Sequence, residues 1–205
     1  GYSDADPRYR NGGSGGVRGV NFGMYGTYIA NNGFYVDAVA KYHRMKNNFS
    51  VKDSLGDSVK GKSKSDGYIL SLEAGKRFNI EQTAFYLEPQ GQVIYSHQQG
   101  DKVNASNGLR VKLGSYDSLI GSTRLAIGYN LVKGDSPIDL QVKSGYVREF
   151  KGNTSYHLNT YKEDYKFRGG WVETSVGVSA QLNKQHNIYG EVSYANGSRF
   201  DKRQI

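Results

Sequence analysis

The fold is indicated most clearly by residues 20 to 42, which read VNFGMYGTYIA, NNG and FYVDAVAKY. In the first part the apolar Phe22 and Met24 alternate with small or polar residues, and the last part alternates in the same way. This two-residue period is that of a β-strand, because successive side chains of a strand point to opposite faces. The intervening NNG tolerates positive φ, so we predict a tight antiparallel hairpin with one apolar and one polar face.

The same alternation recurs along the chain and predicts an all-β, antiparallel fold with about eight strands. These strands are expected at residues 20–29, 34–43, 68–77, 85–96, 119–130, 138–146, 171–182 and 188–194.

The connections between the expected strands alternate in length. Residues 1–19 are expected to be a loop that follows the end of a strand, and long loops are expected at residues 44–66, 98–117 and 151–170. A hairpin extension is the alternative for residues 44–66, and residues 109–113 are expected to extend the neighbouring strands beyond the sheet. In an antiparallel meander every second connection lies on the same rim. We therefore expect long loops on one rim and short turns on the other. Pro89 lies in mid-strand, where its missing N–H predicts a bulge or a local break in pairing.

Composition restricts the class of protein. The chain has 205 residues, 27 glycines, 17 tyrosines, no cysteine and a formal net charge of +8. One domain over residues 1–205 is expected, and no apolar run approaches the roughly 20 residues of a spanning helix. A transmembrane barrel needs no such run, since only alternate residues are apolar. Basic and acidic residues are interleaved, so no nucleic-acid partner is expected.

Aromatic residues are expected in two bands near the ends of the strands, as in the girdles of membrane barrels. The band beside the short turns comprises Tyr28, Phe34, Phe78, Phe85 and Tyr129, and the band beside the long loops comprises Tyr42, Tyr68, Tyr95, Tyr146 and Tyr194.

Periodicity alone does not separate a transmembrane barrel from a soluble ligand-binding β-barrel or sandwich with its apolar face inside. Rim asymmetry and the aromatic bands favour the transmembrane, up-and-down β-barrel. Glycines assigned to the polar face favour it too, because they leave space beside large inward tyrosines; these are Gly75, Gly91, Gly128 and Gly177.

The alternate residues that form the polar face of the strands, here called the polar parity, make up the candidate functional surface. Its charged and amide side chains are expected to face inward, where acids and bases on adjacent strands pair. Two roles stay open for them: they only neutralise one another inside a packed barrel, or they also line a hydrated pore. They are Asp37, Lys41, Glu73, Arg77, Glu88, Gln90, Gln92, Arg124, Asp139, Lys143, Glu173 and Glu191. The four histidines lack the spacing of metal ligands, and no nucleophile motif is present. We therefore assign no catalytic residue, metal or cofactor, and expect no enzyme.

Several short sequence motifs resemble those of a known protein family. GTY at 26–28, NGFYVD at 32–37, LEAG at 72–75, FYLEPQ at 85–90 and IYGEVSY at 188–194 resemble the β-domain of type V autotransporters, close to the AIDA-type adhesins. The resemblance implies a twelve-stranded barrel in the outer membrane of a Gram-negative bacterium. It also implies a pore that holds a linker helix, export of an N-terminal passenger to the cell surface with roles in adhesion and virulence, and help from the barrel-assembly machinery.

Compared with this family pattern, we expect the chain to be truncated at both ends. Gly1-Tyr2-Ser3 resembles the tail of the family's third strand, and the chain stops at Phe200-Asp201-Lys202-Arg203-Gln204-Ile205 rather than at an aromatic end. The expected partners are outer-membrane lipid, the passenger with its linker helix, and the assembly machinery. The alternative function is that of a small surface-binding, adhesin-like barrel in the same membrane.

Overall fold

The protein is one continuous antiparallel sheet. The structure is a computed structural model that describes residues 1–8, 13–52, 56–133, 136–183, 186–197 and 200–204. Its strands are β1 (Tyr2–Ala5), β2 (Ser14–Ile29), β3 (Phe34–Lys52), β4 (Ser58–Lys76), β5 (Phe78–Asn79), β6 (Phe85–Gln98), β7 (Asp101–Asn104), β8 (Arg110–Leu113), β9 (Tyr116–Lys133), β10 (Ser136–Glu149), β11 (Asn153–Leu158), β12 (Tyr161–Lys166), β13 (Gly169–Asn183), β14 (His186–Gly197) and β15 (Phe200–Gln204).

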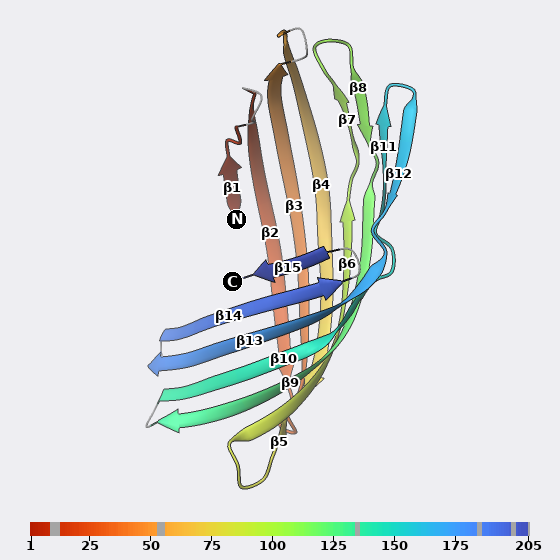
Figure 1. The fold of residues 1–205 in the computed structure, drawn as a ribbon. Coiled ribbons are helices and arrows are strands. Elements are labelled where there is room, and N and C mark those ends of the chain that lie inside the picture. Colours follow the sequence, from red (N-terminus) through yellow and green to blue (C-terminus); the bar gives the residue numbers. More distant parts are fainter. Residues whose placement is uncertain (9–12, 53–55, 134–135, 184–185, 198–199, 205) are drawn as a thin grey trace.

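The strand order confirms the predicted up-and-down topology. The main path runs β1-β2-β3-β4-β6-β9-β10-β13-β14-β15, and each neighbouring pair is antiparallel. The sheet is strongly curved, but the path ends at β1 and β15, which do not pair with each other in the described part of the chain (Figure 1). No helix long and apolar enough to cross a membrane occurs among the described residues.

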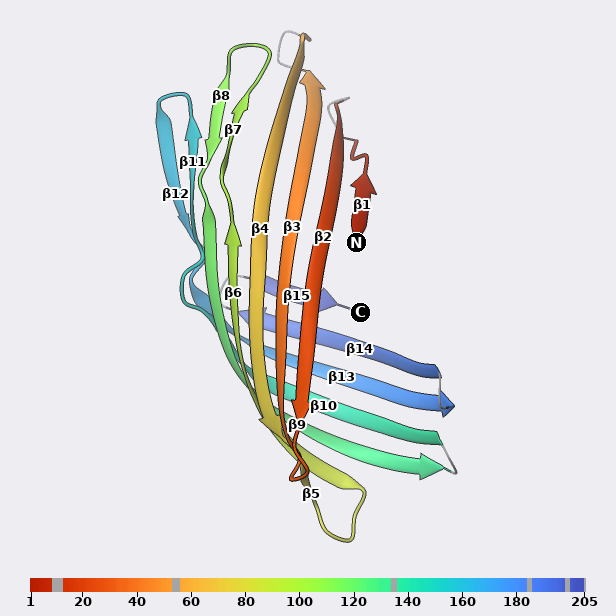
Figure 2. The same cartoon turned by 180° about the vertical axis from the view of Figure 1, so that it is seen from behind.

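All eight predicted strands are present, and most extend further than expected. The short turns gather at one end of the sheet and the long hairpins at the other, as predicted (Figure 2). Parts of the short turns near residues 133 and 183 lie outside the described residues.

The long connections are more ordered than the sequence analysis expected. Most of residues 44–66 continues β3 and β4 as a two-stranded ribbon, which is the hairpin extension given as the alternative to a loop. The second and third long connections carry the hairpins β7–β8 and β11–β12. Residues 14–19 belong to β2 and pair with β3, and residues 17–19 also pair with β1, so the expected loop at residues 1–19 is wrong in part. Backbone pairing with a neighbouring strand prolongs these segments although their side chains are polar.

The two faces of the sheet differ in exposure in the way that a membrane barrel requires. The apolar parity is exposed on the outward face: Phe22, Leu72 and Val176 are 68%, 56% and 58% accessible. Both aromatic bands lie on this face, and Phe85 and Tyr129 pack edge to face with their ring centroids 4.7 Å apart. The soluble alternative required these side chains to be sealed in a core, so it is wrong. Lipid is the solvent that such a face needs.

Pro89 breaks the ladder on one side only. β6 pairs with β9 without interruption through Pro89, but its pairing with β4 ends at Gly75 opposite Gln90. Pairing resumes in the same register where β5 places Phe78 opposite Leu87. The predicted local break is confirmed, and Arg77 lies within the gap. Because it makes no ladder pair there, the Arg77 side chain is free to reach over the neighbouring strands.

Candidate functional site

The polar parity of the strands forms the concave face of the curved sheet. Strand register places the predicted residues in adjacent rows: Asp37 lies opposite Glu73, and Glu73 opposite Gln92. Several side chains reach partners beyond the neighbouring strand, which side chains on the concave side of a curved sheet can do because they converge. The structure therefore brings the polar set together on one face.

The centre of this face is a cluster around Glu88, which is 7% accessible. Arg77 donates from Nε to Glu88 at 2.7 Å, and its Nη1 lies 3.5 Å from Asp139. Gln90 donates to the other oxygen of Glu88 at 2.8 Å. Two carboxylates thus share one guanidinium, and charge-assisted hydrogen bonds of this kind are roughly twice as strong as neutral ones.

Tyr86 of β6 belongs to the same cluster and joins it to β10. It is 1% accessible, its hydroxyl donates to Asp139 at 2.7 Å, and the Arg77 guanidinium lies 3.8 Å above its ring. The ring lies over Gly128 on β9, where an added Cβ would overlap ring atoms of Tyr86. Glycine at this position lets a side chain of β6 reach β10 across the strand between them.

The four glycines assigned to the polar face behave differently from one another. Gly75 lies under the ring of Tyr35 and Gly128 under Tyr86, as predicted. A Cβ added at Gly177 would lie at an ordinary distance of 3.4 Å from Gln141, and none of the three atoms nearest to it belongs to a tyrosine. Gly91 was misassigned: it shares the outward parity of Val93, and an added Cβ there would meet no atom within 4 Å. Only Gly75 and Gly128 therefore make room for a tyrosine ring.

A second group of contacts lies closer to the long-loop rim. Arg124 donates to Gln92 at 3.0 Å and lies 3.6 Å from Glu173, so it links β6, β9 and β13. Lys143 lies 3.7 Å from Glu191, linking β10 and β14. Acids and bases on neighbouring or next-neighbouring strands therefore pair, as the sequence analysis expected.

The edge of the polar face near β2 and β3 is more open. Tyr35 donates to Glu73 at 3.1 Å, and Thr27 to Asp37 at 2.5 Å. Lys41 is exposed and, in the part of the chain that the structure describes, has no polar side-chain partner. Asp37 and Glu73 likewise bond to Thr27 and Tyr35 rather than to other members of the predicted set.

An ion pair and a histidine–carboxylate hydrogen bond lie beyond the outer aromatic band. Arg44 makes a two-pronged contact with Asp66, at 2.7 Å and 3.0 Å, which holds the pKa of the Asp66 carboxyl below its ordinary value. A hydrogen bond from His97, at 2.9 Å, together with one from Tyr95, lowers the pKa of Asp117. Both carboxylates are therefore charged across the physiological pH range.

Sequence reasoning missed two parts of the polar arrangement. Tyr35 and Tyr86 were not included in the candidate functional set, although each lies on the polar face, directly opposite a glycine of a neighbouring strand. That combination was the available signal. Residues 60–64 were taken as loop, yet the pattern Lys-x-Lys-x-Lys has the period of a strand. Among the described residues, no three His, Asp or Glu side chains gather as a metal site.

Comparisons with known proteins agree on one family. The Autotransporter beta-domain model matches residues 1–193. The chain is 45% identical over 207 residues to the probable autotransporter YcgV of Escherichia coli (strain K12), covering 100% of this chain and 22% of that protein. It is 34% identical over 200 residues to the pertactin autotransporter of Bordetella parapertussis, covering 97% of this chain and 22% of the relative.

Solved structures show the same fold. The crystal structure of the beta domain of the Bordetella autotransporter BrkA matches with a TM-score of 0.72 and 30% identity, covering 96% of this chain and 74% of that one. The translocator domain of NalP from Neisseria meningitidis matches with a TM-score of 0.67 at 16% identity, covering 92% and 65%. The chain spans only 22% of the length of the two curated relatives above.

Proposed function

Because the chain belongs to the autotransporter β-domain family, we propose that it is the translocator part of an autotransporter, which anchors and exports an N-terminal passenger. Its setting is the outer membrane of a Gram-negative bacterium. We further propose that residues 1–205 act as one domain and that the barrel-assembly machinery inserts it.

The observation that supports this proposal most directly is the concave polar face. A face that only closed a packed barrel would need neutral pairs, but here Glu88 and Asp139 share a single Arg77 and Lys41 has no partner among the described residues. Charged groups with unused hydrogen-bonding capacity suit a hydrated pore that meets the linker helix of a passenger. We therefore propose that the twelve predicted polar residues line that pore.

We propose no reaction for this chain itself. The buried carboxylate of the cluster around Arg77, Glu88, is engaged by Arg77 and Gln90, which leaves no base beside a nucleophile in this cluster. Any enzymatic activity of the whole protein would belong to its passenger.

Surface display in intact cells tests the proposal. In the full-length protein, Glu88→Gln with Arg124→Gln should reduce the amount of passenger that an external protease can reach, by about tenfold, because both changes leave partners unpaired in a low-dielectric face. The amount of folded barrel in the outer membrane is measured in the same cells by its heat-modifiable migration, and display is expressed per folded barrel.

The matched control is Glu81→Gln with Arg110→Gln, which removes the same charges from an exposed turn and an exposed hairpin strand. This control should display passenger at the normal level. Unchanged display per folded barrel in the Glu88 and Arg124 variant would contradict the role of these residues in export.

A further inference from the structure

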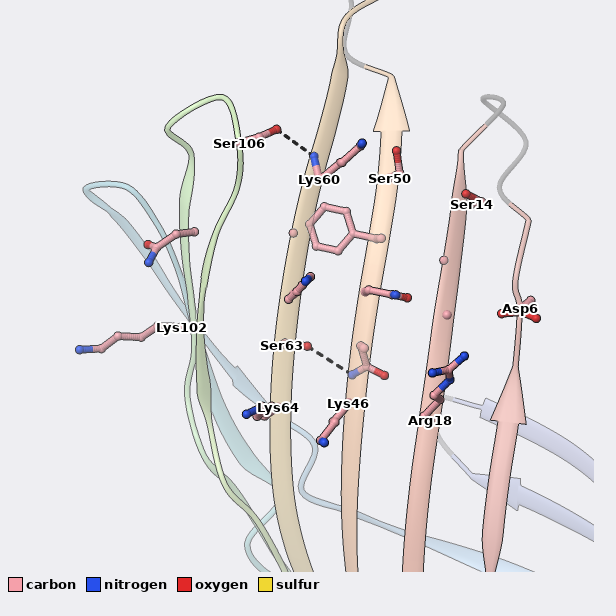
Figure 3. Close-up of a pocket in the computed structure, with 18 residues that line it drawn as sticks. Asp6, Ser14, Arg18, Lys46, Ser50, Lys60, Ser63, Lys64, Lys102 and Ser106 are labelled. Carbon is pink, nitrogen blue, oxygen red and sulfur yellow. Dashed lines mark hydrogen bonds between the residues drawn. The ribbon is translucent and has the colours of Figure 1, made fainter.

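A row of cations lies on the outward face of the extended ribbon. Lysines occupy every second position of β4, at Lys60, Lys62 and Lys64. Strand register places Lys64 opposite Lys46 on β3, and Lys46 opposite Arg18 on β2, so three cations lie side by side (Figure 3). All five share the parity of the outer aromatic band and therefore face away from the pore.

These charges are poorly compensated within the chain. Like charges directly opposite each other on neighbouring strands are destabilising. In the described ranges, none of the four lysines of this row has a carboxylate within salt-bridge distance, and Arg18 has only a loose contact of 3.6 Å with the exposed Asp4. An arrangement that repels itself is stabilised when an anion binds it.

The acidic groups nearby do not neutralise the row. Asp66 is held by Arg44 through two hydrogen bonds. Asp101 accepts hydrogen bonds from the backbone N–H groups of Lys64 and Lys102. Asp6 borders the row from the β1 side, and among the described residues its carboxylate makes no ion pair with a cation of the row. The surface keeps a clear excess of positive charge.

The row borders a hollow that also offers neutral hydrogen-bonding groups. This cationic hollow, with a volume of about 900 Å³, is lined by Arg18, Lys46, Lys60, Lys62 and Lys64 together with Asn48, Ser50, Asn104 and Ser106 (Figure 3). Lysine ammonium groups bind phosphate as point charges, and hydroxyl and amide groups suit the hydroxyls of sugars.

The cationic hollow lies a short distance above the outer aromatic band, which marks the surface of the membrane. Lys46 and Lys64 each lie four residues beyond a tyrosine of the outer aromatic band, Tyr42 and Tyr68. At about 3.4 Å per residue and a tilt of about 40°, this is roughly 10 Å above the band. The outward face at this height meets the head groups of neighbouring lipids, and the long-hairpin rim of such barrels is the extracellular one.

We propose that the cationic hollow binds the phosphorylated head group of a glycolipid of the outer leaflet, that is, lipopolysaccharide. The lysines hold its phosphates, and the serine and asparagine side chains contact its sugars. This role is separate from export of a passenger, because it uses the opposite face of the sheet and needs only the outer-membrane setting.

Binding of purified lipopolysaccharide to the detergent-solubilised full-length protein tests this assignment. Removing two lysines of the central row, with Lys46→Gln and Lys64→Gln, should weaken binding about 25-fold, since a basic residue at an anionic membrane surface contributes about 1 kcal/mol and a tenfold change is 1.4 kcal/mol. Enzymatic removal of the lipid phosphates should weaken binding to the unaltered protein to a similar degree.

The control variant Lys162→Gln with Lys166→Gln removes the same charge from the β11–β12 hairpin and should bind normally. An equal loss in this control would overturn the proposal, because it would show attraction to net charge alone. Equal competition by phosphatidylglycerol vesicles at the same phosphate concentration would also overturn it, since it would show that the sugars are not recognised. The proposal would also be overturned if lipopolysaccharide bound the Lys46→Gln, Lys64→Gln variant at normal strength, or if its dephosphorylated form bound the unaltered protein at normal strength.

Discussion

The seat of Tyr86 over Gly128 gives a quantitative test of the inward cluster. In Gly128→Ala the new Cβ overlaps the Tyr86 ring, so the ring must leave its place between Arg77 and Asp139. Overpacking costs about 1–3 kcal/mol. The hydrogen bond to the Asp139 carboxylate contributes about 1.5–3 kcal/mol, and the contact with the guanidinium about 0.5–2 kcal/mol. Because these losses overlap, we expect a total of about 3–4 kcal/mol.

A double-mutant cycle separates this effect from a general intolerance of the strand. In a Tyr86→Ala background the same Gly128→Ala change should cost less than about 1 kcal/mol, so the coupling energy is about 2–3 kcal/mol. The assay is urea unfolding of the full-length protein in lipid vesicles, followed by loss of its heat-resistant migration.

Gly91→Ala is the matched control for the cycle. It is a glycine of the same sheet, on the outward face, where an added Cβ meets nothing within 4 Å. Its effect should be within about 0.5 kcal/mol of zero. The reasoning is refuted if Gly128→Ala destabilises no more than Gly91→Ala, or destabilises equally with and without the Tyr86 ring.

Two further predictions concern the outward face and the extended ribbon. Leu72→Arg, at an exposed position between the aromatic bands, should destabilise the barrel in vesicles by about 2–4 kcal/mol, whereas Ser71→Arg on the inward face should cost less than about 1 kcal/mol; equal effects in urea unfolding would argue against lipid on the Leu72 side. The lowered pKa of Asp66 means that its pairing with Arg44 stabilises the β3–β4 ribbon above the unfolded pKa of about 3.9 and loses this effect as pH falls through the folded pKa. Hydrogen exchange of the ribbon, corrected for intrinsic rates, should therefore show acid-dependent opening in the parent but not in Asp66→Asn; the same acid dependence in both would contradict this.

The sequence was sufficient for the faces of the sheet but not for its length. Alternation assigned Glu73, Glu88 and Arg124 to one face, because a two-residue period leaves only two choices for each strand. It could not show that residues 44–52 remain in a strand, since their pairing depends on backbone hydrogen bonds to a partner rather than on an apolar pattern. Composition at those positions is polar and suggested a loop.

The contacts within the polar face were also beyond the sequence. That Arg77 reaches both Glu88 and Asp139 depends on the gap opposite Pro89 and on sheet curvature, neither of which is local to one strand. The misassignment of Gly91 was a simple error of parity, and its exposed position corrects it. The sequence shows the alternating lysines at residues 60–64, but it does not show that Lys46 lies beside Lys64, because that depends on the strand register.

The length of the β3–β4 ribbon has a consequence for what can touch this protein from outside the cell. Lys52 lies ten positions beyond Tyr42, about 25 Å above the aromatic band by the same rise and tilt. Access by large soluble molecules should therefore be graded by height: antibodies and bacteriophages would meet the tip of the ribbon, while the rows near Lys46 stay hidden among the saccharides of the envelope.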